Sequence, residues 1–467
     1  MFYPYYTGCS LGTRKTKRKK EKQKKIMQTP RNSMKKMLIK NSTSLVICCM
    51  LSFLSCGSLL AQEKLNLEEV KQAALSYSND IKNGKIRIEQ AEAAKQEAIA
   101  NYFPQISATG VGLYGFKDFI PPIPEILPDG IDNFYQAGAT ATEVVYAGGK
   151  IRSANALANL QAETRTIQAE QTVDSVILNT EQKYWQLVQV QEQLKAIRAS
   201  KIYLDELLKQ QQDLLSAGLI AKNQLLRVRT NRSRVLLQKS KLGNQRKLAL
   251  LDLGLYVGKI YDTTTVVADT LKQVTPPRIK YPKPDLDFDN NNNYKLLEKS
   301  ITASQLQTKI TKSDVLPQVS VGVNAGYFGT FNDAIESQFM PFAFGMVSIP
   351  ISDWWGAGRH KVKQKALQEK IVQNNFQDRK DELKIGIMKC WYDLMDAYKQ
   401  INYAKDNLEY ANENLKVQRD NYNSGLNNLT DLLDAQQQVE SAETEYANAY
   451  ANYKIAESNY LFVTDNL

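Results

Sequence analysis

Few side chains of this sequence are placed to do catalytic or metal chemistry. There is one histidine, His360, and of the five cysteines only Cys390 lies beyond residue 61, so the usual zinc sites cannot form. If both residues lie in one helix, the 30 positions between them correspond to about 45 Å, too far for a Cys–His nucleophilic pair. We find no glycine-rich phosphate loop and no nucleophile elbow. We therefore expect no enzyme activity, no metal and no cofactor.

One pair of carboxylates is placed for a different kind of chemistry. Asp431 and Asp434 are three residues apart in a segment with a helical pattern, so they share one face of the helix. Several such pairs around an axis would draw cations and repel anions. From the spacing alone, a simpler interpretation is two solvated acids near a helix N-terminus, where the helix dipole stabilises them.

The segments that would position these acids occur twice in the sequence. Four short motifs recur in the same order and at nearly the same offset along the chain: Phe103–Ser107 as Leu316–Ser320, Gly148–Lys150 as Gly356–Arg359, Tyr184–Trp185 as Cys390–Trp391, and Ala217–Leu219 as Ser424–Leu426. Four anchors at nearly one spacing indicate an internal duplication.

Each copy predicts a helix, two strands and a long helical hairpin. The first copy, 62–255, has a helix over 67–100, strands over 105–114 and 134–146, and a hairpin over 150–255. An irregular, Pro- and Asn-rich linker follows over 256–293. The second copy, 294–467, has strands over 318–328 and 339–351 and a hairpin over 359–462. Residues 150–216 lack Pro and Gly and keep a coiled-coil spacing, which predicts a helix about 100 Å long.

The net charge of +11 comes from the N-terminus. Residues 1–61 hold 13 of the 60 basic and one of the 49 acidic residues, so the rest of the chain is nearly neutral. The basic run over 14–25 is compatible with a nucleic-acid patch, but an over-extended start with initiation near Met34 explains it more simply. We expect no nucleic-acid partner.

Residues 34–61 have the pattern of a secretory signal, with Lys35 and Lys36 before the apolar segment 45–54. Cleavage after Ala61 fits the small-residue preference, and a lipidated Cys56 is the alternative. We therefore interpret 1–61 as a leader and the remaining chain as exported.

The strands predict how an exported chain without a long apolar helix can still enter a membrane. Only helices and closed barrels span bilayers, and four strands cannot close an open barrel. Three chains would supply 12 strands, together with six helical hairpins for a tube. Tyr146, Trp354 and Trp355 lie where the strands meet the long helices, as rings do at a membrane interface. The alternative is that these rings pack the junction.

In the order and spacing of these motifs, the chain resembles the TolC-type outer-membrane efflux proteins over about 65–463. The resemblance implies a mainly α protein with membrane β-strands: a homotrimer whose 12-stranded β-barrel continues into a periplasmic α-helical coiled-coil tunnel. It also implies an adaptor (membrane fusion protein) and an inner-membrane pump of the RND or ABC type, which open a tunnel closed at its tip.

The segment 422–435 is similar to the family's gate segment, which implies that Asp431 and Asp434 ring the pore constriction. Where the family pairs an Arg with an Asp between chains, this sequence has Asn427 and Gln224. We therefore expect any latch on the closed tip to use hydrogen bonds through Tyr422, Asn427 and Gln224.

The two hairpin turns contain Gly218, Leu219, Ile220, Gly425 and Leu426. The apolar side chains among them are expected to be exposed, which is unusual for a free surface. Adaptor docking would explain them. A hydrophobic contact that caps each helix is the alternative.

These patterns favour a passive exit channel of a tripartite efflux or type I secretion system. Its expected location is the outer membrane of a Gram-negative bacterium, in contact with outer-membrane lipid and with most of the chain in the periplasm. An exported coiled-coil structural or adhesive protein would explain the helical pattern but not the duplicated strands. The transported substrate stays open.

Overall fold

The computed structural model describes residues 64–284, 290–331 and 335–467. The leader expected over 1–61, with its alternatives at Cys56 and Ala61, lies outside the described residues.

The duplication of the sequence is repeated in the lengths of the helices. The two helices that precede the strands have 22 residues each, and the two that follow them have 67 residues each; the returning helices have 36 and 35 residues. In chain order these helices are α3 (Asn79–Ala100), α4 (Lys150–Ser216), α5 (Lys222–Val257), α7 (Asn292–Ser313), α8 (Ala357–Asn423) and α9 (Leu429–Val463). At 1.5 Å per residue, α4 and α8 are each about 100 Å long.

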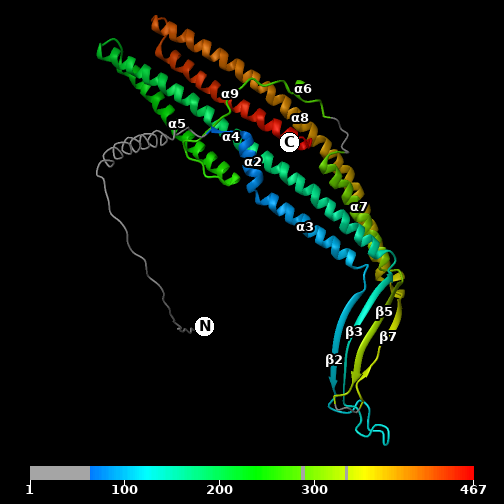
Figure 1. Ribbon diagram of the computed structural model, residues 1–467. Coiled ribbons are helices and arrows are strands. Elements are labelled where there is room, and N and C mark those ends of the chain that lie inside the picture. Colours follow the sequence, from blue (N-terminus) through cyan, green and yellow to red (C-terminus); the bar gives the residue numbers. More distant parts are fainter. Residues whose placement is uncertain (1–63, 285–289, 332–334) are drawn as a thin grey trace, which may run out of the picture. The chain divides into compact units, whose positions relative to one another are not determined.

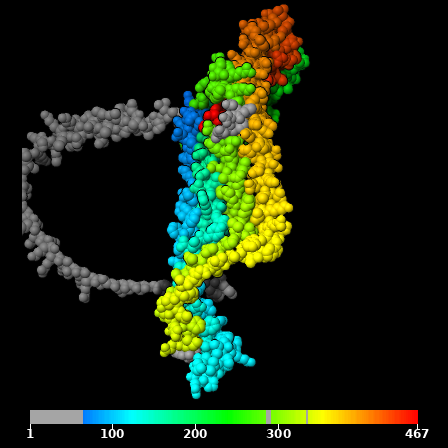
Figure 2. Space-filling model, turned by 90° about the vertical axis from the view of Figure 1, so that its right-hand side faces the viewer, coloured from blue at the N-terminus to red at the C-terminus, as the bar shows by residue number. Residues whose placement is uncertain are grey.

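The helices pack side by side in rows of four. Next to the strands the row runs α3, α4, α7, α8, and nearer the hairpin turns it runs α5, α4, α9, α8. The first row is seen in Figure 2 as adjacent bands from blue through cyan and green to yellow-orange. In both rows α4 occupies an inner position, and α8 lies at one end.

The four main strands form an antiparallel sheet in the matching order. β2 (Gln105–Tyr114) pairs with β3 (Asn133–Tyr146), β3 pairs with β5 (Gln318–Gly329), and β5 pairs with β7 (Phe342–Ser348). Figure 1 shows these strands in this order. β2 and β7 each pair along one side only, so the sheet has two open edges.

The sheet differs from expectation at its last strand. A strand over 339–351 was expected, but β6 (Gln338–Phe339) and β7 are separate, and Ile351–Trp354 forms a 3-10 turn. The reason is proline, which has no N–H for the ladder: Pro341 separates the two strands, and Pro350 follows the end of β7.

The helix expected over 67–100 is two helices, α2 (Leu67–Tyr77) and α3. Ser78 has extended dihedral angles, and its hydroxyl accepts a hydrogen bond from the N–H of Ile81. A serine that caps a helix in this way starts a new helix and ends the previous one.

The linker is more ordered than its composition predicts. β4 (Val266–Val267) pairs in parallel with β1 (Lys64–Leu65), and α6 (Pro277–Lys280) is a single helical turn. These segments lie against a core that contains both repeated tryptophans, Trp185 and Trp391. Trp185 packs edge-on against Tyr450 of α9 and Trp391 packs at a tilt against Tyr460 of α9, so the two copies share one apolar core.

Candidate gate, docking turns and membrane surface

The two hairpin turns have the same backbone geometry. At each one a glycine with positive φ follows the long helix: Gly218 at 70° and Gly425 at 75°. The next residue, Leu219 or Leu426, donates its N–H to a carbonyl five residues earlier, and the glycine donates to a carbonyl three residues earlier. This is the Schellman motif, which requires a left-handed residue and is why glycine recurs here.

The leucines of these motifs do not cover the helix ends. A Schellman turn often buries the residue after the glycine against the last helical turn. Here Leu219 is 71% exposed and Leu426 is 74% exposed, while Ile220 is half-buried. The alternative of a hydrophobic cap therefore does not describe either leucine, and both are free to contact another molecule.

The two predicted gate acids lie in the first turns of α9. Asn428 caps this helix, since its side chain accepts hydrogen bonds from the N–H groups of Thr430 and Asp431. Asp431 and Asp434 are both exposed, on the side opposite the buried Leu432 and Leu433. Within the described chain neither carboxylate forms an ion pair. The two charges therefore project away from their own subunit.

The three predicted latch residues do not meet one another within the chain. The Tyr422 hydroxyl accepts a hydrogen bond of 2.8 Å from Gln211 Nε2 on α4, and Asn427 donates to Gln418 of its own hairpin. The side chain of Gln224 has no hydrogen-bond partner among the described residues. Tyr422 therefore joins the two hairpins through a residue that was not among the predicted ones.

Gln211 was missed, although its position carried a signal. The coiled-coil spacing of α4, continued past Leu194 through Leu204 and Leu207, reaches Gln211, so a polar side chain occupies a core position. It is 0% exposed, and its Oε1 atom has no partner among the described residues. Burial also raises the pKa of nearby Tyr203 to about 12. The hydrogen bond to Tyr422 thus lies in a partly buried site, where losing it would leave the buried Gln211 amide without a partner.

A buried ionic cluster joins three helices farther from the turns. Glu440 of α9 is 4% exposed and accepts from both terminal nitrogens of Arg234 on α5, at 3.0 and 3.3 Å, and from the Ser200 hydroxyl of α4 at 2.8 Å. Burial, and then the charge of Glu440, raises the pKa of Glu443. The cluster fixes the second hairpin to the first about three helical turns from its start.

At the other end, the strands join the helices through a hydrogen-bonded junction. Ser313 donates to the Gly148 carbonyl, and Lys150 pairs with Asp314 at 2.8 Å. Trp354 Nε1 donates to the carbonyl of Val315, yet its ring is half exposed, and so are the rings of Tyr146 and Trp355. The three aromatic rings therefore lie at the surface of the junction and do not fill it.

The sheet has one mostly apolar face, on which Asn133 and Glu143 are the exceptions. The register places on it, from strand to strand, the residues Ile106, Ala108, Tyr135, Ala137, Ala139, Ala141, Val319, Val321, Val323, Ala325, Tyr327, Ala343 and Val347. We call this the apolar face. The opposite face is mixed: it carries the polar Ser107, Thr109, Gln136, Thr140, Ser320 and Asn324 together with the apolar Val111, Leu113, Phe134, Phe342, Phe344 and Met346.

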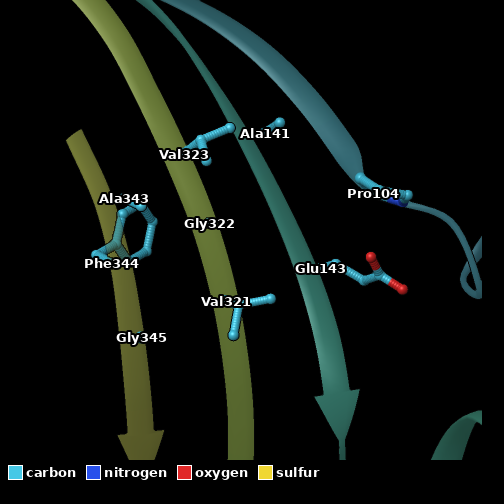
Figure 3. Close-up of a pocket in the computed structure, with 9 residues that line it drawn as sticks. All are labelled: Pro104, Ala141, Glu143, Val321, Gly322, Val323, Ala343, Phe344 and Gly345. Atoms are coloured by element: carbon cyan, nitrogen blue, oxygen red, sulfur yellow. The ribbon is translucent and has the colours of Figure 1, made fainter. Parts of the chain in front are cut away.

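One charge lies on the apolar face. Glu143 is the single charged residue of the four main strands, three residues before Tyr146 at the junction. It lines a shallow recess of about 570 Å³ with Val321 and Val323, and Figure 3 shows its carboxylate directed toward Pro104. A charge at the end of an apolar strand face is typical of the border between lipid and water.

The end helices of the row near the turns carry apolar stripes without a cover. On α5 the exposed leucines are Leu226, Leu237, Leu248, Leu251 and Leu255. From Tyr392 to the end of α8 the exposed large apolar residues are Tyr392, Tyr403, Tyr410 and Val417. In both sets successive members are one, two or three helical turns apart, since these take about 4, 7 and 11 residues. Each set therefore lies on one face of its helix.

No helix in the described part of the chain combines the length and the apolar character that a bilayer crossing requires.

Comparison with known proteins gives one family. The model of the outer membrane efflux protein family matches residues 70–259 and 289–460. No curated protein matches the sequence significantly.

Several solved structures share the fold. The outer-membrane channel OprN superposes with a TM-score of 0.75 at 16% identity, over 86% of this chain and 90% of that one. The CmeC outer membrane channel of Campylobacter jejuni gives 0.72 at 17% identity, over 86% and 85%. The outer membrane protein VceC of Vibrio cholerae gives 0.74 at 12% identity, over 85% and 95%.

Proposed function

This chain belongs to the outer membrane efflux protein family, and from that premise we propose that it is the outer-membrane exit channel of a tripartite efflux or type I secretion system. It works as a passive conduit in the outer membrane of a Gram-negative bacterium, with the long helices in the periplasm. One observation carries the proposal: the sheet and both rows of helices have an open edge at each end. The first copy supplies one edge, with β2, α3 and α5, and the second copy supplies the other, with β7 and α8.

A row with two different open ends closes by joining copies head to tail. β2 and β7 are the open strands, and α5 and α8 are the end helices of the row near the turns. Such a heterologous contact produces a ring when the rotation closes. Three copies, as in the TolC-type proteins that the chain resembles, would give a 12-stranded barrel above a tube of helices.

The apolar stripes support the same ring. Rotation about an axis along the helices keeps each residue at its height, so residues at equal distances from the hairpin turns meet across the contact. Leu226 of α5 and Val417 of α8 both lie within about two helical turns of their hairpin turns. Leu237 and Tyr410 lie about four helical turns away, and Leu255 and Tyr392 lie about nine turns away. At each of these three levels the two heights agree within about 3 Å.

The sheet supports insertion into lipid. Closure would pair the open strand edges, as a bilayer requires. β2, β3 and β5 have 10, 14 and 12 residues, enough for tilted crossings of the hydrocarbon. The apolar face would meet lipid, with Tyr135 and Tyr327 toward one interface and Glu143, Tyr146, Trp354 and Trp355 toward the other.

The gate is proposed at the start of α9. Since Asp431 and Asp434 project from the subunit without ionic partners in the described chain, a trimer would bring six carboxylates around its axis. Such a ring attracts cations. Within a subunit, the bond from Gln211 to Tyr422 resists separation of the two hairpins. A latch between subunits would use Gln224 and, once it exchanges its bond to Gln418, Asn427.

The docking partner is proposed to contact the turns. Six exposed leucines, Leu219 and Leu426 from each subunit, would form an apolar ring at the tip of the tube. An adaptor that buries them would transmit the action of an inner-membrane pump of the RND or ABC type.

Fractionation and conductance test the proposal together. The purified protein should come from the outer-membrane fraction as a heat-modifiable trimer and produce discrete conductance steps in a planar bilayer. A soluble monomer without conductance would contradict it. Leu237→Asp should prevent assembly, because it buries a charge in the subunit contact, whereas Gln245→Asp, on the flank of α5, should assemble normally.

A further inference from the structure

A basic recess lies between the linker and the helices, away from the gate, the turns and the sheet. It has a volume of about 490 Å³. Four cationic side chains line it: Lys64 of β1, Lys195 and Arg198 of α4, and Arg246 of α5. Threonines 263, 264 and 270 of the linker line it as well. No acidic residue is among the described residues that line the recess.

These cations are mostly uncompensated. Lys195 pairs with Glu192, but within the described chain Lys64, Arg198 and Arg246 form no ion pair. Burial lowers the pKa of Arg246, and the charge of Arg198 adds to this effect. Residues beyond the leader are nearly neutral in sum, so a pocket of four cations is not explained by the overall charge. Like charges held together without a counterion favour the binding of an anion.

The recess is pre-formed. Arg246 donates one nitrogen to the Thr263 carbonyl at 2.6 Å and another to the Thr265 carbonyl, so the guanidinium ties the linker to α5. Fixed cationic groups near threonine hydroxyls and backbone groups are the donor set that oxyanions require.

The recess is also separate from the proposed subunit contact. Arg246 lies two residues before Leu248, and residues at this spacing point to different sides of a helix. The stripe of α5 can therefore be covered by a second copy while the recess stays open.

We propose that this recess binds an oxyanion with at least two negative charges, of the phosphate or polycarboxylate class. The bound anion would join β1, α4, α5 and the linker through their cationic side chains. This inference does not depend on the channel function, because it rests on the four cations alone.

Calorimetric titration of the purified assembled protein with pyrophosphate and with citrate at low salt tests it. We expect sub-millimolar binding that weakens as salt is added. Arg198→Ala should weaken it about fivefold or more, the effect of losing a charge-assisted contact. Arg198 has no hydrogen bond or ion pair in the described chain, so its loss should leave folding intact. Lys247→Ala, which removes an exposed charge outside the recess, should bind within about twofold of the parent.

A hexaglutamate peptide identifies the source of the anionic group. Binding at least tenfold tighter than citrate would indicate an acidic chain as the natural ligand, and weaker binding a free oxyanion; both agree with the proposal. It is overturned if neither citrate nor pyrophosphate binds at about 10 mM, a concentration that would reveal even millimolar affinity. It is equally overturned if Arg198→Ala binds them as tightly as the parent.

Discussion

Gln211 and Tyr422 are joined by one hydrogen bond of 2.8 Å across 211 residues of sequence. Gln211 lies in the last two turns of α4, and Tyr422 is the second-last residue of α8. The bond therefore connects the first hairpin to the second close to both turns. Any opening of the tip that separates the hairpins must break it.

Removing the Tyr422 hydroxyl should favour the separated state. In Tyr422→Phe the fully buried Gln211 amide would keep no partner, which costs about 1–3 kcal/mol in the closed arrangement. We expect a higher mean conductance in planar bilayers and a lower unfolding midpoint. Tyr77→Phe is the control, since Tyr77 is an exposed tyrosine at the end of α2, outside the apolar stripes and far from the turns. Equal conductance and equal midpoints for the two variants would contradict the role of the bond.

This bond marks the limit of what the sequence predicts. The hairpins and the strands could be predicted, because the periodicity and the repeated motifs that indicate them depend on residues close together in the sequence. The hydrogen bond from Gln211 to Tyr422 within the chain was not predicted, because hydrogen bonding depends on how two helices face each other. The cluster at Glu440 escaped notice for the same reason: Arg234 lies 206 residues away. The latch through Tyr422, Asn427 and Gln224 stays a prediction about contacts between chains.

Two other differences between the expected and the observed elements could have been predicted from the sequence. Pro341 and Pro350 lie inside the strand expected over 339–351, and each marks the border that the structure has. Ser78 followed by Asn79 and Asp80 is a helix-start pattern in the middle of an expected helix. The exposure of Leu219 and Leu426 agreed with expectation, whereas Ile220, expected to be exposed with them, is half-buried.

The gate acids should set ion selectivity. In Asp431→Asn and Asp434→Asn each trimer loses three of six carboxylates, so the preference for cations should fall, and more strongly in the double variant. Reversal potentials in a salt gradient measure it. Asp213→Asn removes an exposed acid near the other turn and should change selectivity little. A double variant with the selectivity of the parent would show that these acids do not line the constriction.

The ionic cluster at Glu440 should dominate the stability of the helices near the turns. Glu440→Ala leaves the buried Ser200 hydroxyl and the half-buried Arg234 without their shared partner, and we expect the free energy of unfolding to fall by about 1–3 kcal/mol. Denaturant titration measures the loss. Glu409→Ala, at an exposed position of α8, should stay within about 0.5 kcal/mol of the parent. Similar losses for both variants would mean that the cluster contributes no more than a surface charge.

The two sheet faces should respond oppositely to the same charge. Ala108 lies on the apolar face and its neighbour Thr109 on the other. Ala108→Arg should reduce insertion into outer membranes by about 2–4 kcal/mol per subunit, whereas Thr109→Arg, which would face the lumen, should insert and only lower conductance. Quantifying protein in outer-membrane fractions compares them. Loss of insertion in Thr109→Arg, with Ala108→Arg normal, would reverse the assignment of the faces.

The exposed leucines of the turns should matter for transport and not for assembly. Leu219→Asp and Leu426→Asp place charges where the adaptor is proposed to bury apolar surface, and each Schellman turn keeps its glycine and backbone bonds. We expect trimers of normal stability and conductance, together with a loss of drug tolerance in cells that rely on this protein for efflux. Ser216→Asp, an exposed position one turn away, is the matched control. Because all three variants should assemble alike, a difference in tolerance reports docking alone. Full tolerance with both leucines replaced would rule out the turns as the adaptor contact.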